Sequence, residues 1–250
     1  MSTATLAGRS DAGFVAKTVA LVRKDLRIET RSRDTLPPML AFSLAVTLLL
    51  AFTLPTTTRL TSPLSTPAGT VPLVDVLSGF LWITILFAGL IGFARTFEVE
   101  RAEGAVDSLL LVPVDRSSLF LAKTMANLTY VIVVQLFLVP VFLLLFQVSL
   151  GSGWVPLVGV LFLVDIGFVA IGTLFSALAA RTRSRELMLP ILALPALVPI
   201  FIAAVELTSD LLLGGGFTAI AERGWFGILV AFDVIFGVLG ALAFEYALDA

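Results

Sequence analysis

Two aspartates, Asp165 and Asp233, are the ionisable side chains that lie inside the long apolar runs of this sequence. An ionisable group at membrane depth is costly and is a functional candidate by default. The two could form the acid pair of an intramembrane hydrolase, or they could line a polar vestibule together with Glu206 and Asp210. Alternatively, each is protonated or hydrogen-bonded to a neighbouring helix, for example to Gln135 in the third apolar run.

The sequence has no histidine and no cysteine. Ser-His-Asp catalysis, thiolate chemistry and most zinc sites are therefore excluded. Haem iron would lack its usual strong axial ligands, because only four methionines and two tyrosines remain as candidates. We expect no catalytic residue, no metal site and no cofactor bound by this chain.

A second group of polar residues lies in the stretch 95–127. The preceding helix is predicted to run on through an acidic turn to Gly104, a residue suited to the left-handed conformation that ends helices. A short helix follows, Pro113 ends it, and Asp115 is placed to cap the next helix, which continues into the third span. A short transverse helix between two membrane helices is a device for receiving force from a soluble partner. The alternative is a purely structural turn.

The elements that carry these residues are predicted to be membrane-spanning helices. Hydrophobic residues make up 58% of the chain and charged residues 14%, and the mean hydropathy is +1.06. An ordinary globular domain is about half apolar and a quarter charged. A bilayer core of about 30 Å needs roughly 20 apolar residues of helix. We therefore predict an all-α polytopic membrane protein with six transmembrane helices, at 37–54, 76–94, 128–150, 154–180, 187–205 and 225–244.

The distribution of Lys and Arg predicts the orientation of these helices. Fourteen of the 16 basic residues lie before the first span or in the second and fourth loops; only Arg59 and Arg223 lie on the other side. Basic residues gather on the cytoplasmic side of a membrane protein. Both termini are therefore expected in the cytoplasm. The 18 acidic residues balance the basic ones, which argues against a nucleic-acid partner.

Residues 14–31 have the periodicity of an amphipathic helix, with apolar residues on one half and cations on the other. Such a helix is expected to lie in the headgroup plane with its apolar face inward. Asp25 and Glu29 fall on the apolar side; Glu29 can be matched by Arg33, whereas Asp25 has no evident partner. The helix is either a generic membrane-surface anchor or an elbow helix that also contacts a cytosolic partner.

Two further segments have a local signature. Pro190, Pro195 and Pro199 are expected to bend the fifth span. The stretch 206–224 could form a short surface or re-entrant helix after it. Residues 55–72, rich in Thr, Ser and Pro, are expected to form an irregular loop between the first two spans.

The pattern Glu98-x-Glu100-Arg101-x-x-Gly104, followed by Leu109-Leu110-x-x-Pro113 and Lys123, resembles the coupling-helix loop of ABC-2 type exporter permeases. A longer run of matches is similar to the haem exporter protein B family, cytochrome c maturation protein B (CcmB). It includes residues 81–105, 172–179, 181–186, the proline-rich fifth span and 232–236. The resemblance covers about residues 14–248.

The resemblance implies a cytoplasmic N-terminus with an amphipathic helix, residues 1–36, followed by a six-span permease domain, residues 37–248. It implies a non-catalytic subunit of the cell membrane that works with a separate soluble ABC ATPase, where ATP is bound and hydrolysed. The sequence lacks a G-x-x-x-x-G-K-[ST] phosphate loop, in agreement with this division. The ATPase-coupling loop would comprise Glu98, Glu100, Arg101, Gly104, Asp107, Leu109, Leu110 and Pro113.

The same resemblance implies the other partners and the cargo. They are a second copy of the chain, haem-handling membrane proteins and the haem chaperone of cytochrome c maturation. Haem would be the cargo, either exported as such or released with its loaded chaperone at the expense of ATP. The alternatives are an ABC-2 exporter of a lipid, drug or other cargo, and a non-transporting scaffold for chaperone assembly.

Overall fold

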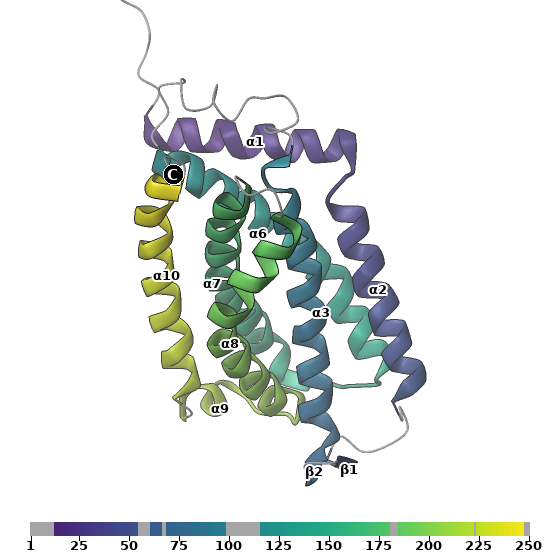
Figure 1. Ribbon diagram of the computed structural model, residues 1–250. Coiled ribbons are helices and arrows are strands. Elements are labelled where there is room, and N and C mark those ends of the chain that lie inside the picture. The colour runs from purple at the N-terminus through teal and green to yellow at the C-terminus, as the bar shows by residue number, and fades with distance from the viewer. Residues whose placement is uncertain are drawn as a thin grey trace, which may run out of the picture.

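The computed structural model describes residues 13–54, 61–66, 69–98, 116–180, 185–222 and 224–247. Six long helices stand side by side, and the amphipathic helix α1 (Phe14–Ser32) lies across one end of them (Figure 1). Each long helix is apolar and long enough to cross a membrane. The predicted fold class is thereby confirmed. The six are α2 (Leu36–Thr53), α3 (Leu73–Arg95), α6 (Arg116–Leu145), α7 (Trp154–Ala180), α8 (Arg185–Leu212) and α10 (Trp225–Ala247).

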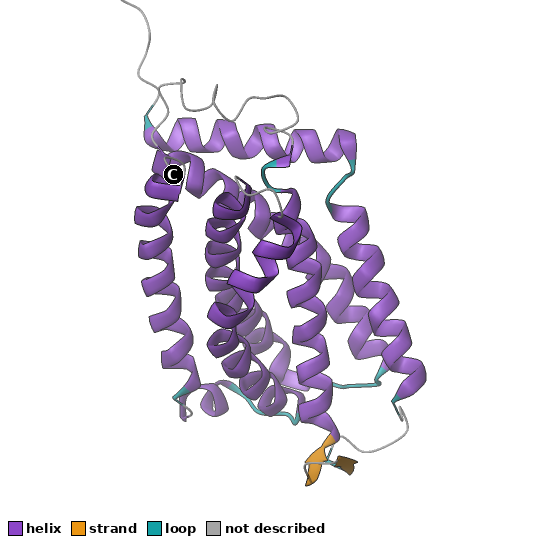
Figure 2. Ribbon diagram, viewed as in Figure 1, coloured by secondary structure: helices purple, strands orange, loops and turns teal. Residues whose placement is uncertain are grey.

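The far end of the bundle carries the small elements. Strands β1 (Pro63–Thr66) and β2 (Gly69–Pro72) pair antiparallel, with Pro63 opposite Pro72, and Figure 2 shows this hairpin projecting beyond the helices. The expectation of a wholly irregular loop over 55–72 is therefore wrong for these residues. A 3₁₀ turn (Gly151–Gly153) leads into α7. Of the predicted stretch 206–224, residues 206–212 belong to α8 and α9 (Phe217–Glu222) is a separate short helix.

Three long helices end elsewhere than the sequence suggested. Helix α6 begins at Arg116, as predicted for the helix that follows Asp115 and continues into the third span. It ends at Leu145 rather than 150, and the following turn contains the left-handed residue Gln147 (φ 52°), where the amide of Val148 donates to the carbonyl of Leu143 (2.9 Å). Helix α8 runs without interruption to Leu212, so its three prolines lie inside one helix. Helix α3 stops at Arg95 and a turn follows; the prediction that it runs on toward Gly104 is wrong at this turn.

Helix α7 is the central helix, in contact with α3, α6, α8 and α10. Its contact with α3 is reciprocal. A Cβ added to Gly172 of α7 would lie 2.1 Å from the ring of Phe93, and one added to Gly89 of α3 would lie 2.3 Å from the ring of Phe168. The two rings pack edge to face, 4.9 Å between centroids. Small residues let helix backbones approach closely in membranes, and here each glycine makes room for the partner helix's phenylalanine.

The amphipathic helix α1 packs on α6 with a polar face inward. Thr18, Asp25 and Glu29 are buried, whereas Val15 and Val19 are 71% and 58% exposed. Asp25 and Glu29 thus lie on the side that was predicted to face inward, whereas Val15 and Val19, expected on the same side, are exposed. The acids face inward because the bundle supplies partners for them.

Candidate functional site

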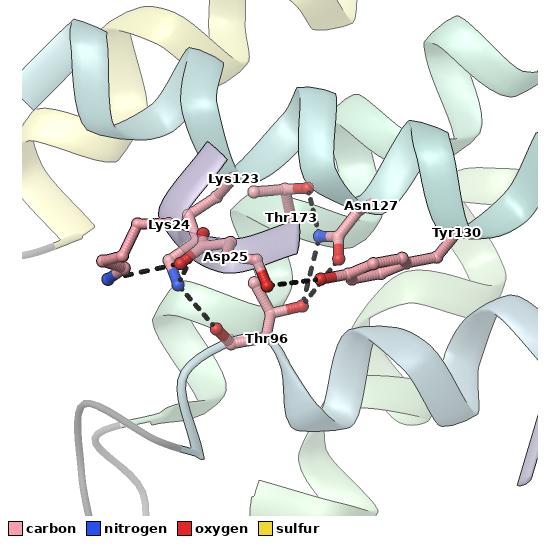
Figure 3. A network of polar contacts seen from close by, with 7 residues as sticks. All are labelled: Lys24, Asp25, Thr96, Lys123, Asn127, Tyr130 and Thr173. Carbon is pink, nitrogen blue, oxygen red and sulfur yellow. Dashed lines mark hydrogen bonds and ion pairs between the residues drawn. The ribbon is translucent and has the colours of Figure 1, made fainter. Parts of the chain in front are cut away.

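A polar network centred on Lys123 lies where α1 crosses the bundle (Figure 3). Lys123 is 4% exposed, and its Nζ lies 3.1 Å from Asp25 Oδ2 of α1. The same ammonium donates to the carbonyl of Thr96 (3.1 Å) and lies 5.4 Å from the centroid of the Phe97 ring. Lys24 pairs with the other oxygen of Asp25 at 3.2 Å. One buried cation thus joins α6 to α1 and to the end of α3.

A second branch of the network runs through Asn127 to the centre of the bundle. Lys123, Asn127 and Tyr130 follow each other at spacings of four and three residues, so they share one face of α6. The Asn127 amide donates to the hydroxyls of Thr96 (3.1 Å) and Thr173 of α7 (3.0 Å). Tyr130 donates to the carbonyl of Asp25 (3.4 Å). Thr173 follows Gly172, so the close contact of α3 and α7 brings both threonines within reach of one amide.

The network holds both flanks of the predicted coupling loop. Thr96 directly follows α3, and Lys123 lies seven residues after the start of α6 at Arg116, so a residue of the network lies on each side of the loop. Glu98 pairs with Arg95 at 3.3 Å, and both side chains are 41% exposed. The other predicted coupling residues, and the Asp115 cap, lie outside the described residues: Glu100, Arg101, Gly104, Asp107, Leu109, Leu110 and Pro113.

The two acids of α1 both have partners that the sequence did not reveal. Asp25, expected to lack one, binds Lys123 and Lys24. Glu29, expected to match Arg33, instead accepts the amides of Thr35 (3.1 Å) and Leu36 (2.7 Å) at the start of α2. These amides have no partner within the helix, and a carboxylate there also meets the positive end of the helix dipole. Both assignments were wrong because a helical wheel shows only neighbours within α1.

A cavity of about 380 Å³ lies between α1, α3 and α6 beside this network. Charges of both signs line it: Asp25, Glu29, Arg95, Glu98 and Lys123. Such walls suit charged or hydrogen-bonding groups rather than a large apolar ring. The described residues contain no group of three or more acids that could hold a metal ion.

The intramembrane acids lie on different sides of α7. Asp165 is fully buried and its Oδ1 accepts the Gln135 amide of α6 (2.8 Å), as the structural alternative proposed. Asp233 of α10 points at Gly167, where an added Cβ would lie 2.5 Å from its Oδ1. Residues two apart on a helix point about 200° apart. Asp165 therefore lies in the α6–α7 contact and Asp233 in the α7–α10 contact. This separation argues against the acid pair of a hydrolase.

Sequence analysis placed Lys123 in the coupling-loop pattern but did not group it with Thr96, Asn127 and Thr173. The signal was present in α6, where a cation and an amide recur one turn apart in a helix that continues as a membrane span. Such polar residues beside an apolar run indicate burial against other protein rather than lipid. Their partners on α1 and α7 could not be named without the fold.

Six apolar helices, with a buried ionic network at one end, define a multi-pass helical membrane protein. The chain belongs to the CcmB protein family, whose model matches residues 16–250. It is 31% identical over 199 residues to Heme exporter protein B of Rhodobacter capsulatus, covering 75% of this chain and 80% of that protein. It is 28% identical over 187 residues to Heme exporter protein B of Paracoccus denitrificans, with the same shares covered.

Proposed function

We propose that this chain is the membrane subunit of an ATP-driven haem exporter that acts in cytochrome c maturation. Family membership and the names of both relatives support haem export. ATP is bound and hydrolysed by a separate soluble ATPase, since the sequence has no phosphate loop. Haem is cargo rather than a resident cofactor, because the chain has neither His nor Cys to ligate iron.

The observation that carries this proposal is the buried network at the flanks of the coupling loop. Force applied to the loop by an ATPase reaches α3 through Thr96, α1 through Lys123 and Asp25, and α7 through Asn127 and Thr173. Fully satisfied buried polar networks are rigid, because breaking any bond leaves a buried group unpaired. The network therefore couples the two flanks of the loop to α1, α3 and α7.

The Lys and Arg distribution and the family support the remaining parts of the proposed assembly. The network end and both termini face the cytoplasm, on the evidence of the Lys and Arg distribution, and the protein resides in the cell membrane. Two copies of the chain pair, since two ATPase subunits need two docking loops. Haem-handling membrane proteins and a haem chaperone on the far side complete the complex.

The test is a cytochrome c maturation assay in a strain that lacks this gene. We expect loss of covalent haem attachment, rescued by the wild type and by the control variant Thr70→Ala on the exposed hairpin at the other end. Glu100→Ala and Gly104→Pro should insert normally but fail to rescue. An ATPase-inactive partner should reproduce the defect, which a passive scaffold would not show.

Normal cytochrome c in the deletion strain would contradict haem export and favour an exporter of a lipid, drug or other cargo. Full rescue by both loop variants would contradict ATP coupling through the loop.

A further inference from the structure

A groove of about 250 Å³ opens on the membrane-facing side between α6 and α7. Its rim is apolar and exposed: Leu136, Val158 and Phe162 are 69%, 56% and 50% exposed. Its lining also includes Gln135 and Asp165, the hydrogen-bonded pair described above. The groove thus combines an apolar entrance with polar groups behind it.

Hydrogen-bonding capacity in this groove is left unused. Asp165 is fully buried, its Oδ1 accepts Gln135, and its Oδ2 has no hydrogen-bond partner among the described residues. Pro140 lies in the same lining and has no N–H, so the carbonyl of Leu136 lacks its usual helical donor. Unsatisfied polar groups in a bilayer cost several kcal/mol each. A carboxyl oxygen buried behind the groove therefore lacks a hydrogen bond that the described residues do not supply.

The depth of the groove excludes a lipid headgroup as the source of that hydrogen bond. Asp165 lies eleven residues into α7, about 16 Å of helix rise from its start. The hydrocarbon core is about 30 Å thick, so this carboxyl lies near its middle, where acyl chains offer neither donor nor acceptor. The volume is also below the roughly 300–1,000 Å³ of ordinary ligand pockets. It suits one or two side chains.

A second copy of this chain does not supply that hydrogen bond either. In the described parts of the six spans, the exposed hydroxyl side chains are Thr53 and Ser117, each at a helix end. Thr129 is half-buried and lies six residues before Gln135, about 9 Å of helix rise from the depth of Asp165. Exposed residues at mid-depth are otherwise apolar, so a homodimer would bury the groove without satisfying Asp165.

We propose that the α6–α7 groove docks a transmembrane helix of a different membrane protein, which inserts a Ser, Thr, Asn or Gln side chain toward Asp165. A hydroxyl or amide both donates and accepts, so it can bond the carboxyl whether or not that group is protonated. This surface is separate from the cytoplasmic network and requires no ATPase.

The test is photo-crosslinking in native membranes with benzoylphenylalanine at Phe162, on the groove rim. The matched control position is Phe226 of α10, which is 44% exposed. We expect an adduct at Phe162 alone, and mass spectrometry should map it to a transmembrane segment of another protein with a hydroxyl or amide at that depth. Asp165→Leu should lower the yield about three- to fifteen-fold, the range that one interhelical hydrogen bond supplies.

Two further variants separate docking from folding. Asp165→Asn keeps an oxygen and an amide and should retain the adduct. Gln135→Leu breaks the internal hydrogen bond but leaves the carboxyl, so it should retain the adduct as well. Equal loss in Gln135→Leu and Asp165→Leu would overturn the proposal, because the effect would then belong to α6–α7 packing. Adducts with lipid alone, or with a second copy of the chain, would also overturn it.

Discussion

Replacing Lys123 with Met should release α1 from the bundle. Methionine is close to lysine in length but carries no charge, so the variant removes the ion pair with Asp25 and the hydrogen bond to Thr96 while largely keeping the packing. Asp25 would then be left with Lys24, whose side chain is 41% exposed. The change therefore tests whether the buried cation holds α1 in place.

The magnitude follows from the burial of the pair. The Lys123 and Asp25 side chains are 5% and 10% exposed. Breaking a buried pair by removing one partner costs about 3–5 kcal/mol. Because Lys24 still neutralises part of the Asp25 charge, we expect Lys123→Met to lose about 3 kcal/mol of stability, at the lower end of that range. The Asp25→Asn, Lys123→Met double variant should lose less stability than the sum of the two single variants, and the difference is a coupling energy of about 2 kcal/mol.

The assay is amide hydrogen exchange along α1 in lipid nanodiscs. A loss of 3 kcal/mol should lower protection in α1 by about a hundredfold. The control is Arg95→Met, which removes the exposed pair with Glu98; exposed pairs contribute about 0–1 kcal/mol, so α1 should keep its protection. Unchanged exchange in Lys123→Met, or a coupling energy below about 0.5 kcal/mol, would refute the assignment of Lys123 as the anchor of α1.

Three further predictions concern packing, capping and orientation. Gly172→Ala should lower the free energy of unfolding by about 1–3 kcal/mol, because the added Cβ would lie 2.1 Å from the Phe93 ring. Adding Phe93→Leu to the same chain should recover part of that loss. An unchanged melting temperature in Gly172→Ala would contradict the α3–α7 contact. Glu29→Ala should lower the free energy of unfolding by about 1–2 kcal/mol, because the amides at the start of α2 lose their acceptor. Glu29→Gln should lower it less, since the glutamine amide oxygen still accepts a hydrogen bond. Equal decreases in the melting temperatures of the two variants would argue against capping. Because the chain has no cysteine, Ser32→Cys and Ser65→Cys each introduce a single thiol for labelling. A membrane-impermeant maleimide should label Ser65→Cys in intact cells but Ser32→Cys only after lysis. The reverse pattern would contradict the predicted orientation.

The helices themselves were predictable from the chain, because burial in a bilayer is a property of about 20 consecutive residues. Asp165 and its hydrogen bond to Gln135 were also within reach, since so few polar residues occupy the spans. Helix ends were less predictable. Residues 116–127 were predicted as the helix that leads into the third span, and they form the first turns of α6. The burial of Lys123 and Asn127 against the neighbouring helices was not predictable, because their partners lie far away in the sequence.

What the sequence by itself determined is therefore the local part: the number of spans, the side that carries the cations, and the amphipathic character of α1. Only the tertiary structure decided which face of α1 turns inward and that Lys123 meets Asp25, a residue nearly one hundred positions earlier. Hydropathy sums over neighbours along the chain, whereas an ion pair depends on two groups that packing brings together. The same holds for the second branch of the network, where Gly89 and Gly172 allow α3 and α7 to approach closely and Thr96 and Thr173 reach the same amide.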